Sequence, residues 1–430
     1  MLHDLTEHVN TFETEVTAGG TTLAEPRRGD RPPRRGSGVA GDLTRRARGG
    51  PPRPVRRRGG IAAACASDGT PDRHALVLPR IRALASLMAA AIAACGDVAS
   101  TSSIEPPACT GNLVDLSSDV HPIHDPAIAR EKGTYYVYSS SPTGTFYASS
   151  DLRTWTRRGS VFDGIPPWIL DLIPQANHIG SPDIEWFDGR WVLYYQSHIQ
   201  GTCDAAIGVA TNRTLDPTSP DYEWKDHGLV LRSTPEFANF PYLCGQDGVW
   251  FDAIDPTLFV DPADGRPWLA FGSTLGGIYL VEVDPGTLRP TQQPRDFVLL
   301  AARDLGLPDP IIEAPYLVHR GAWYYLFLSH DRCCQGANTT YKILVGRSRR
   351  LGGPYLDHEG RALLDGGGTV LIEREGSLIG TGHADVFSDG GYDYLVHHAY
   401  DATSGYEPVL NVRRLVWDDE GWPSACQLGG

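Results

Sequence analysis

The chain has 430 residues, ordinary aromatic content and a formal net charge of −14. The charge is uneven, since residues 1–95 carry 15 Arg against 9 acidic residues, which leaves the remainder at −20. An acidic body of this kind argues against nucleic-acid binding, because a phosphate backbone requires a basic surface. A neutral polymer such as a polysaccharide remains compatible with it.

The first 110 residues divide into three predicted segments. Residues 1–75 are rich in Arg, Pro and Gly and lack apolar periodicity, so we expect a disordered extension. We also expect the natural start to lie near Val77, which would make this extension a gene-start artefact. In residues 76–95, Arg80 and Arg82 precede an apolar run, and "AIAAC" resembles the lipobox of bacterial lipoproteins, with Cys95 acylated. The alternative is a buried helix with a core cysteine. Residues 96–110 would be a linker.

Five similar stretches follow. They read "HDPAIAREKGTYYVYSS", "SPDIEWFDGRWVLYYQS", "IDPTLFVDPADGRPWLAFGS", "EAPYLVHRGAWYYLFLS" and "HADVFSDGGYDYLVHHAY". Each has an acid near its start, a short apolar run, a Gly-containing turn and an alternating aromatic run. A Gly or Asp-Gly turn between two period-2 runs predicts a β-hairpin.

Further strand-like segments between these hairpins give about four strands per unit, and no amphipathic helix is evident after residue 110. Repeats of this length and composition predict the blades of a β-propeller. We therefore predict an all-β fold: a five-bladed β-propeller of four-stranded antiparallel blades around a central axial pocket, spanning residues 111–428.

Each unit contributes one acid at its start. In a propeller the first strand of each blade lies innermost, so the acids should converge on one axial pocket; they are Asp125, Asp183, Asp255, Glu313 and Asp385. For Asp183 and Asp385 we keep open a purely structural role, in which the carboxylate accepts backbone hydrogen bonds. Clustered carboxyls push their pKa values apart, giving the acid and base that glycoside hydrolysis needs.

These motifs, together with "CCQGANTTYKILVGRS", resemble glycoside hydrolase family 43 over residues 118–423, and within it the endo-α-1,5-L-arabinanases. The resemblance implies inverting hydrolysis with Asp125 as general base, Glu313 as general acid and Asp255 tuning the pKa of Glu313. It also implies that His383 in "GHAD" holds a metal near the axis, usually Ca²⁺. A core histidine bonded to the backbone is the alternative for His383.

We expect His124, Asp183, Trp186 and Asp252 to contact the substrate, a plant cell-wall arabinan or related pentosan. The protein should be an exported monomer that meets the membrane only through its lipid anchor. Alternatives are an exo-acting α-L-arabinofuranosidase or β-xylosidase of the same fold, and a non-catalytic carbohydrate-binding propeller. Disulfide pairing cannot be deduced from sequence. Cys109 and Cys426 flank the folded region and are candidates to tie its ends together.

Overall fold

A computed structural model describes residues 109, 111–235, 244–246, 249–274 and 276–427. The three expected N-terminal segments, apart from Cys109, lie outside the described residues. The described chain is almost wholly β-structure, with one α-helix, α1 (Pro167–Leu172). Four short 3-10 segments accompany it, Pro294–Asp296, Gly336–Asn338, Leu363–Asp365 and Ala402–Ser404. None of the helices in the described part of the chain has the length and apolar character needed to span a bilayer.

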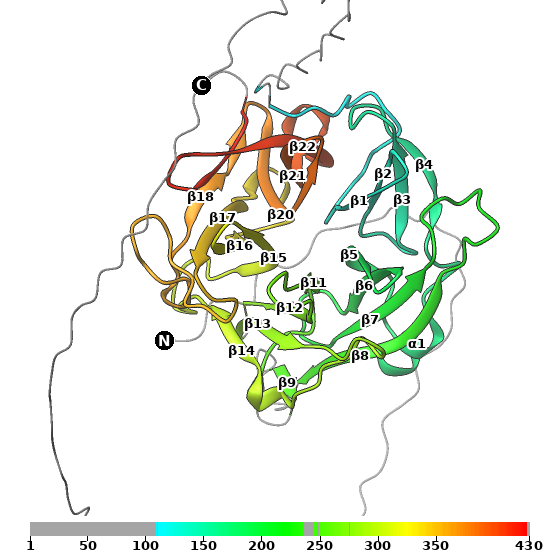
Figure 1. Ribbon diagram of the computed structural model, residues 1–430, viewed down its shortest axis with the longest axis horizontal. Coiled ribbons are helices and arrows are strands. Elements are labelled where there is room, and N and C mark those ends of the chain that lie inside the picture. The colour runs from blue at the N-terminus through cyan, green and yellow to red at the C-terminus, as the bar shows by residue number, and fades with distance from the viewer. Residues whose placement is uncertain (1–108, 110, 236–243, 247–248, 275, 428–430) are drawn as a thin grey trace, which may run out of the picture. The chain divides into compact units, whose positions relative to one another are not determined.

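Five antiparallel sheets surround a common axis, which confirms the predicted propeller (Figure 1). The first sheet contains β1 (Ala127–Glu131), β2 (Thr134–Tyr138), β3 (Thr145–Ser149) and β4 (Thr156–Ser160). The third contains β11 (Thr257–Val260), β12 (Pro267–Ser273), β13 (Gly277–Glu282) and β14 (Val298–Ala301). The fourth contains β15 (Ile312–Arg320), β16 (Trp323–His330), β17 (Lys342–Ser348) and β18 (Thr369–Ile372). In these three blades the expected count of four strands is met.

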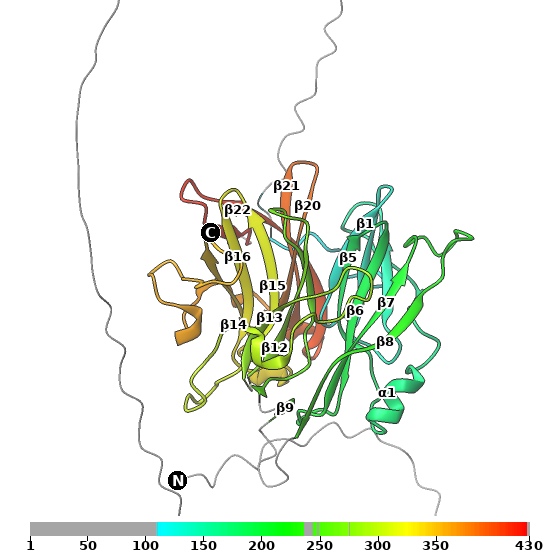
Figure 2. The same cartoon turned by 60° about the horizontal axis from the view of Figure 1, so that its bottom comes forward.

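The other two blades carry extra strands. The second sheet contains β5 (Gly180–Phe187), β6 (Arg190–His198), β7 (Ala205–Asn212) and β8 (Lys225–Pro235), extended by β9 (Cys244–Gln246) and β10 (Val249–Trp250). The fifth contains β19 (Arg374–Glu375), β20 (Leu378–Asp389), β21 (Tyr392–Asp401), β22 (Glu407–Trp417) and β23 (Pro423–Ala425). Four strands per blade therefore holds for the core of each sheet, and Figure 2 shows the long strands of the second blade beside α1.

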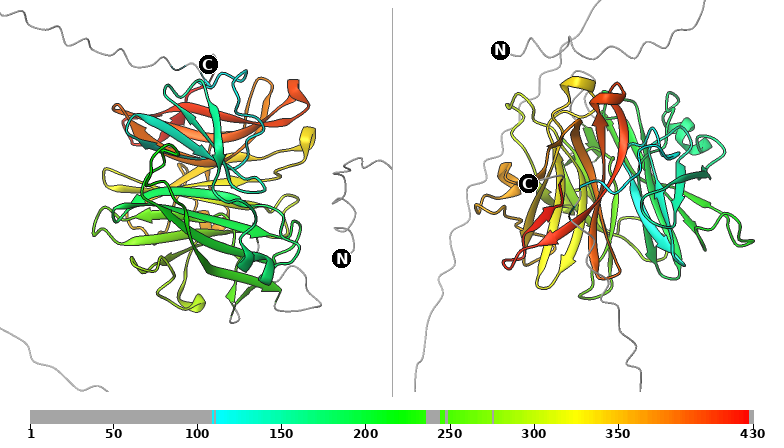
Figure 3. Two further views of the ribbon diagram at one scale, coloured as in Figure 1. Left: turned by 90° about the vertical axis from the view of Figure 1, so that its right-hand side faces the viewer. Right: turned by 90° about the horizontal axis from the view of Figure 1, so that it is seen from above.

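The apolar core is divided among the interfaces between neighbouring blades. Alternation along each strand places one set of side chains on each face, and both faces are covered because a further sheet lies on either side (Figure 3). Blades 1 and 2 share one buried cluster, and similar clusters fill the interfaces 2–3, 3–4, 4–5 and 5–1. Five sheets packed in this way form a closed ring.

The ring is closed by the two ends of the described chain. Cys109 forms a disulfide with Cys426, as expected. The Leu113 N–H donates a hydrogen bond to the Val412 carbonyl (2.7 Å), so the N-terminal segment lies along β22 of the last blade. The first and fifth blades are thus joined covalently as well as by packing.

Candidate active site

Each innermost strand has one strained turn residue, which lies two residues before β1 and β11 and within β5, β15 and β20, and these five residues surround one mouth of the axis. The turn residue has φ between 42° and 58°, the left-handed region that few non-glycine residues adopt, and in four blades a proline follows it. The five turn residues are Asp125, Ser181, Asp255, Ala314 and His383. These positions, rather than the five acids, are the structural equivalents among the blades.

The expectation of five equivalent acids is therefore wrong for three of them, because Glu313 lies one residue before its turn residue and Asp183 and Asp385 lie beyond theirs. Asp183 and Asp385 lie two residues beyond their turns, buried along the axis. Each carboxylate accepts a backbone hydrogen bond from the next blade, Asp183 from Leu258 (2.8 Å) and Asp385 from Ile128 (2.7 Å). Their contacts match the structural role left open for them.

The remaining acids are connected by one chain of hydrogen bonds that crosses four blades. Ser140 donates its hydroxyl to Asp125 Oδ2 (2.5 Å) and accepts the Ser181 N–H (2.8 Å). Ser181 in turn donates its hydroxyl to Asp255 Oδ1 (2.7 Å), and Asp255 Oδ2 accepts the Ala314 N–H (3.0 Å). Ala314 directly follows Glu313, so Asp125, Asp255 and Glu313 meet at one mouth of the axis.

Three imidazoles surround the carboxylate of Asp125. His124 Nδ1 lies 2.8 Å from Oδ1, His383 Nδ1 lies 3.2 Å from it and His398 Nδ1 lies 3.7 Å from it. Burial by itself would raise the pKa of Asp125, but the imidazoles outweigh it and hold that pKa well below the usual range. Asp125 is therefore ionised at neutral pH.

Glu313 has the opposite charge state. Burial, aided by the negative charge of Asp255, raises the pKa of Glu313 to about 8, although a hydrogen bond with Tyr341 acts in the other direction. Burial also raises the pKa of Asp255. At neutral pH the site therefore combines a carboxylate at Asp125 with a protonated carboxyl at Glu313.

A cavity of about 480 Å³ opens beside Asp125. Its wall comes mainly from blades 1 and 2 and from the loop between β16 and β17, and includes His124, Asp125, Asn177, Gln196, His198 and Cys334. Burial lowers the pKa of His198 to about 4 and also lowers the pKa of His178, so both imidazoles are neutral. Polar, mostly uncharged groups of this kind suit the hydroxyls of a neutral sugar.

The expected substrate contacts are only partly brought together. His124 lines the cavity, but Asp183 does not. Asp252 is buried and also outside the wall; its pKa is raised to about 7 by burial and by Asp255. Trp186 lies at the far end of β5, half-exposed against Trp191, roughly 15 Å along the strand from Ser181. Strand direction thus separates Trp186 from the pocket.

The metal expectation at His383 is not matched by a cage of oxygen ligands. Ca²⁺ prefers six to eight oxygens. Among the described residues, the one compact group of metal-ligating atoms, within 4.8 Å of one another, is His124, Cys333 and His398. These residues offer nitrogen and sulfur, and Cys333 is in a disulfide. An ion at His383 would take most of its ligands from water, so calcium binding stays a prediction.

Several residues of the site were missed in the sequence. They are polar side chains whose hydrogen bonds hold the acids. Ser140, Gln196 and His398 lie on or just after the second strands of their blades, Ser181 lies on β5 and Tyr341 directly precedes β17. For Ser140, Gln196 and His398 the available signal was their position at the ends of the aromatic runs "YYVYSS", "VLYYQS" and "YLVHH", which return to the same mouth as the acids.

A five-bladed propeller with two carboxyls of opposite charge state at the mouth of its axis, one of which lines a polar cavity, defines the class of a carbohydrate-active enzyme. Residues 121–423 match the family described as Glycosyl hydrolases family 43, and the chain belongs to that family.

Its relatives include solved structures. It is 37% identical over 324 residues to the extracellular exo-α-(1→5)-L-arabinofuranosidase of Cellvibrio japonicus, covering 74% of this chain and 88% of that protein. It is 36% identical over 307 residues to the extracellular endo-α-(1→5)-L-arabinanase 1 of Bacillus subtilis, and the match covers 70% of this chain and 87% of that protein. The structure of Cellvibrio cellulosa α-L-arabinanase complexed with arabinohexaose matches with a TM-score of 0.65 at 37% identity. The match covers 71% of this chain and 96% of that chain.

Proposed function

We propose that this protein is an inverting endo-α-1,5-L-arabinanase. The observation that carries the proposal is the opposite protonation of Asp125 and Glu313, linked through Asp255 at the mouth of the axis. A relative named as an endo-α-(1→5)-L-arabinanase supports the choice of linkage.

In the proposed reaction, Asp125 removes a proton from a water molecule that attacks the anomeric carbon. Glu313 protonates the departing glycosidic oxygen in the same step, and no covalent intermediate forms. Inverting enzymes place the two carboxyls roughly 6.5–9.5 Å apart so that a water can enter. Asp255 keeps Glu313 protonated through its charge and fixes the local backbone by accepting the Ala314 N–H.

The second candidate is exo-acting cleavage of the same linkage, favoured by the 37% identity to a relative named as an exo-α-(1→5)-L-arabinofuranosidase. Early products separate the two: an endo-acting enzyme releases a ladder of arabino-oligosaccharides from debranched arabinan, whereas an exo-acting enzyme releases one product size throughout. Proton NMR of the fresh product should show the inverted anomer in either case.

Export is supported by relatives that are named extracellular. A lipid anchor at Cys95, a monomeric state and a Ca²⁺ near His383 belong to the same proposal. Mass spectrometry of the membrane fraction would test the anchor, because acylation adds a defined mass to the peptide that begins at Cys95.

We expect Asp125→Ala and Glu313→Ala each to lower turnover of linear arabinan by about 10²–10⁴-fold, the usual contribution of a general acid or base. Release of reducing ends measures the rate, and circular dichroism checks the fold. Asp264→Ala, an exposed acid in a hairpin of blade 3, is the matched control and should retain full activity. Near-normal rates for either site variant would contradict the assignment.

A further inference from the structure

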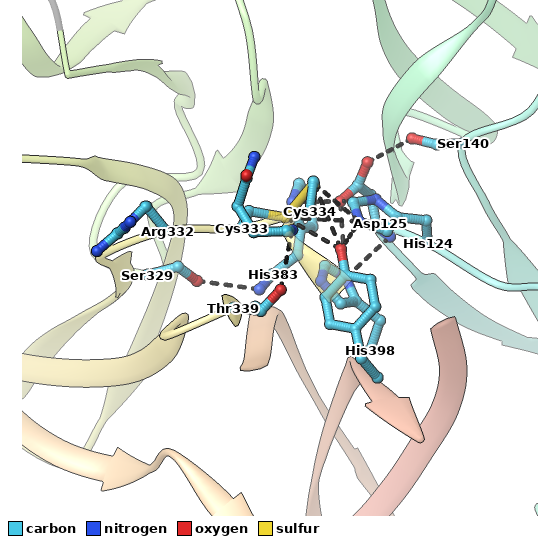
Figure 4. The surroundings of a disulfide bond; sticks show 12 residues. His124, Asp125, Ser140, Ser329, Arg332, Cys333, Cys334, Thr339, His383 and His398 are labelled. Atoms are coloured by element: carbon cyan, nitrogen blue, oxygen red, sulfur yellow. Dashed lines mark hydrogen bonds and ion pairs between the residues drawn. A yellow bond between two sulfur atoms is a disulfide. The ribbon is translucent and has the colours of Figure 1, made fainter. Parts of the chain in front are cut away.

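A disulfide between adjacent cysteines, Cys333 and Cys334, lies against the pair His124–Asp125 (Figure 4). It belongs to the loop between β16 and β17, on the opposite side of the mouth from blade 1. Cys334 is exposed and forms part of the cavity wall, whereas Cys333 is half-buried. The mechanism proposed above does not use this disulfide.

Both sulfurs contact the same two side chains. Cys333 Sγ lies 3.6 Å and Cys334 Sγ 3.5 Å from His124 Nε2. The hydroxyl of Tyr400, on β21, lies 3.2 Å and 3.3 Å from the same two sulfurs. His124 Nε2 and the Tyr400 hydroxyl are themselves only 2.6 Å apart. The two sulfurs, the phenol and the imidazole thus form one contact group.

The chemistry of a disulfide gives this group a direction. A disulfide has no S–H and can only accept, so the Tyr400 hydroxyl donates its proton toward sulfur and its oxygen accepts from His124 Nε2–H. The other ring nitrogen, Nδ1, faces the carboxylate of Asp125, which also only accepts. A Tyr400 proton directed at sulfur leaves Nε2 as the donor to the phenol oxygen, and the charge of Asp125 favours this doubly protonated form of His124 by raising its pKa against the effect of burial.

We propose that the Cys333–Cys334 disulfide is a positioning element of the active site, which holds the Tyr400 hydroxyl so that His124 remains a double donor and pairs with Asp125. This inference rests on the proposed function, because it assigns the disulfide to the geometry of the proposed base. Reduction by a dithiol such as dithiothreitol transfers two electrons and two protons and leaves two thiols. The new S–H groups donate to the phenol oxygen and compete there with the hydrogen bond from His124 Nε2–H.

The loop has its own hydrogen bonds, so reduction should change this pattern without unfolding the loop. Thr340 N–H donates to the Arg332 carbonyl (3.0 Å), and Gln335 N–H donates to the Thr339 hydroxyl (2.9 Å). Arg332 also pairs with Asp309 (2.7 Å). The effect of reduction on catalysis can therefore be separated from a loss of structure.

The experiment compares kcat and KM on linear arabinan before and after treatment with dithiothreitol, with circular dichroism as a check on the fold. We expect kcat to fall about tenfold, the value of one charge-assisted hydrogen bond, with KM little changed and with recovery on reoxidation. The control is Cys333→Ser/Cys334→Ser, whose hydroxyls donate as thiols do. It should have the low kcat and not respond to dithiothreitol, although the Cys109–Cys426 disulfide remains reducible.

Tyr400→Phe tests the coupling, because without the phenol oxygen reduction should have no further effect on kcat. An unchanged kcat in the reduced native enzyme would overturn the inference while leaving the proposed function intact. A rise in KM alone would also overturn it, since the disulfide would then only line the pocket.

A readout independent of activity is the ¹⁵N spectrum of the histidine-labelled protein, assigned with His124→Asn. Both His124 nitrogens should be protonated in the oxidised form, and the Nε2 resonance should move on reduction. If neither form cleaves arabinan, the proposed function fails and this spectrum alone decides the positioning role; an Nε2 resonance that does not respond to reduction would refute it.

Discussion

At the scale of single residues, neighbours decide which carboxyl holds a proton. Asp125 and Glu313 both lie at the mouth of the axis, and burial acts on both in the same direction. Three imidazoles beside Asp125 reverse the effect of burial there, whereas the anion of Asp255 adds to it at Glu313. The difference between base and acid therefore comes from the charges placed next to each group.

Asp255→Asn should move the alkaline limb of the kcat/KM profile to lower pH. The negative charge of Asp255 raises the pKa of Glu313, so its removal lowers that pKa, and Glu313 loses its proton earlier as the pH rises. A pH series of initial rates measures the shift. An unchanged alkaline limb, or one displaced upward, would contradict the tuning role.

The sequence singled out the three acids because each stands next to a proline, or two residues before one, at the start of a repeated hairpin. It did not reveal Ser140 or Tyr341, because serine and tyrosine next to a strand are common and carry no signal of their own. Their partners are 15 and 28 residues away along the chain, and only the packing of strands brings them together.

At the scale of elements, the register of the innermost strands decides which acids reach the mouth. Asp183 and Asp385 lie two residues past the turn, where they satisfy backbone N–H groups of the next blade. Spacing between acids along the sequence cannot show this depth, because a strand of period two places residues i and i+2 on the same face. The sequence could therefore predict that five acids lie near the axis, but not that three lie at its mouth and two, Asp183 and Asp385, lie deeper.

Two buried acids that lie deeper along the axis than the mouth, Asp385 and Glu185, make the stability of the fold depend on pH. Burial raises the pKa of Asp385 to about 7, and burial with Asp385 raises the pKa of Glu185 to about 8. The folded state therefore keeps protons that the unfolded chain has lost above pH 4. The contribution of these two groups to stability is full below about pH 4 and is lost as the pH rises through 7 to 8.

Asp385→Asn should reduce this dependence, since an amide does not titrate and its oxygen can still accept the Ile128 N–H. We expect the variant to be more stable than the native protein at pH 8 by on the order of 1 kcal/mol, with a smaller difference at pH 5. Calorimetric Tm values at the two pH values measure it. A native protein whose Tm does not fall between pH 5 and pH 8 would contradict the expectation.

At the scale of the whole molecule, the ring depends on five equivalent interfaces between blades. Repetition of the hairpin pattern was enough to predict the number of blades and the shared axis. The additional strands of blades 2 and 5 were not predictable, because β9, β10 and β19 have only two or three residues and no measurable period. Strand pairs this short form where neighbouring segments happen to lie side by side, and their residues need no particular β propensity.

Cys109→Ser/Cys426→Ser should lower the Tm by roughly 3–8 °C, because a disulfide across so long a loop typically contributes 2–5 kcal/mol in a domain of this size. The separation is 317 residues, and the bond joins the first and last blades. Calorimetry of the oxidised native protein and of the variant measures the difference. Equal Tm values would mean that packing alone closes the ring.

The same bond makes residues 109–426 a covalent circle. A single proteolytic cut in any surface loop of that circle opens it into a line without releasing a fragment, and the cut blade keeps its neighbours on both sides. Hydrolysis at the first nick would add one water and leave a single covalent molecule, and only a second cut or reduction of the bond would divide it.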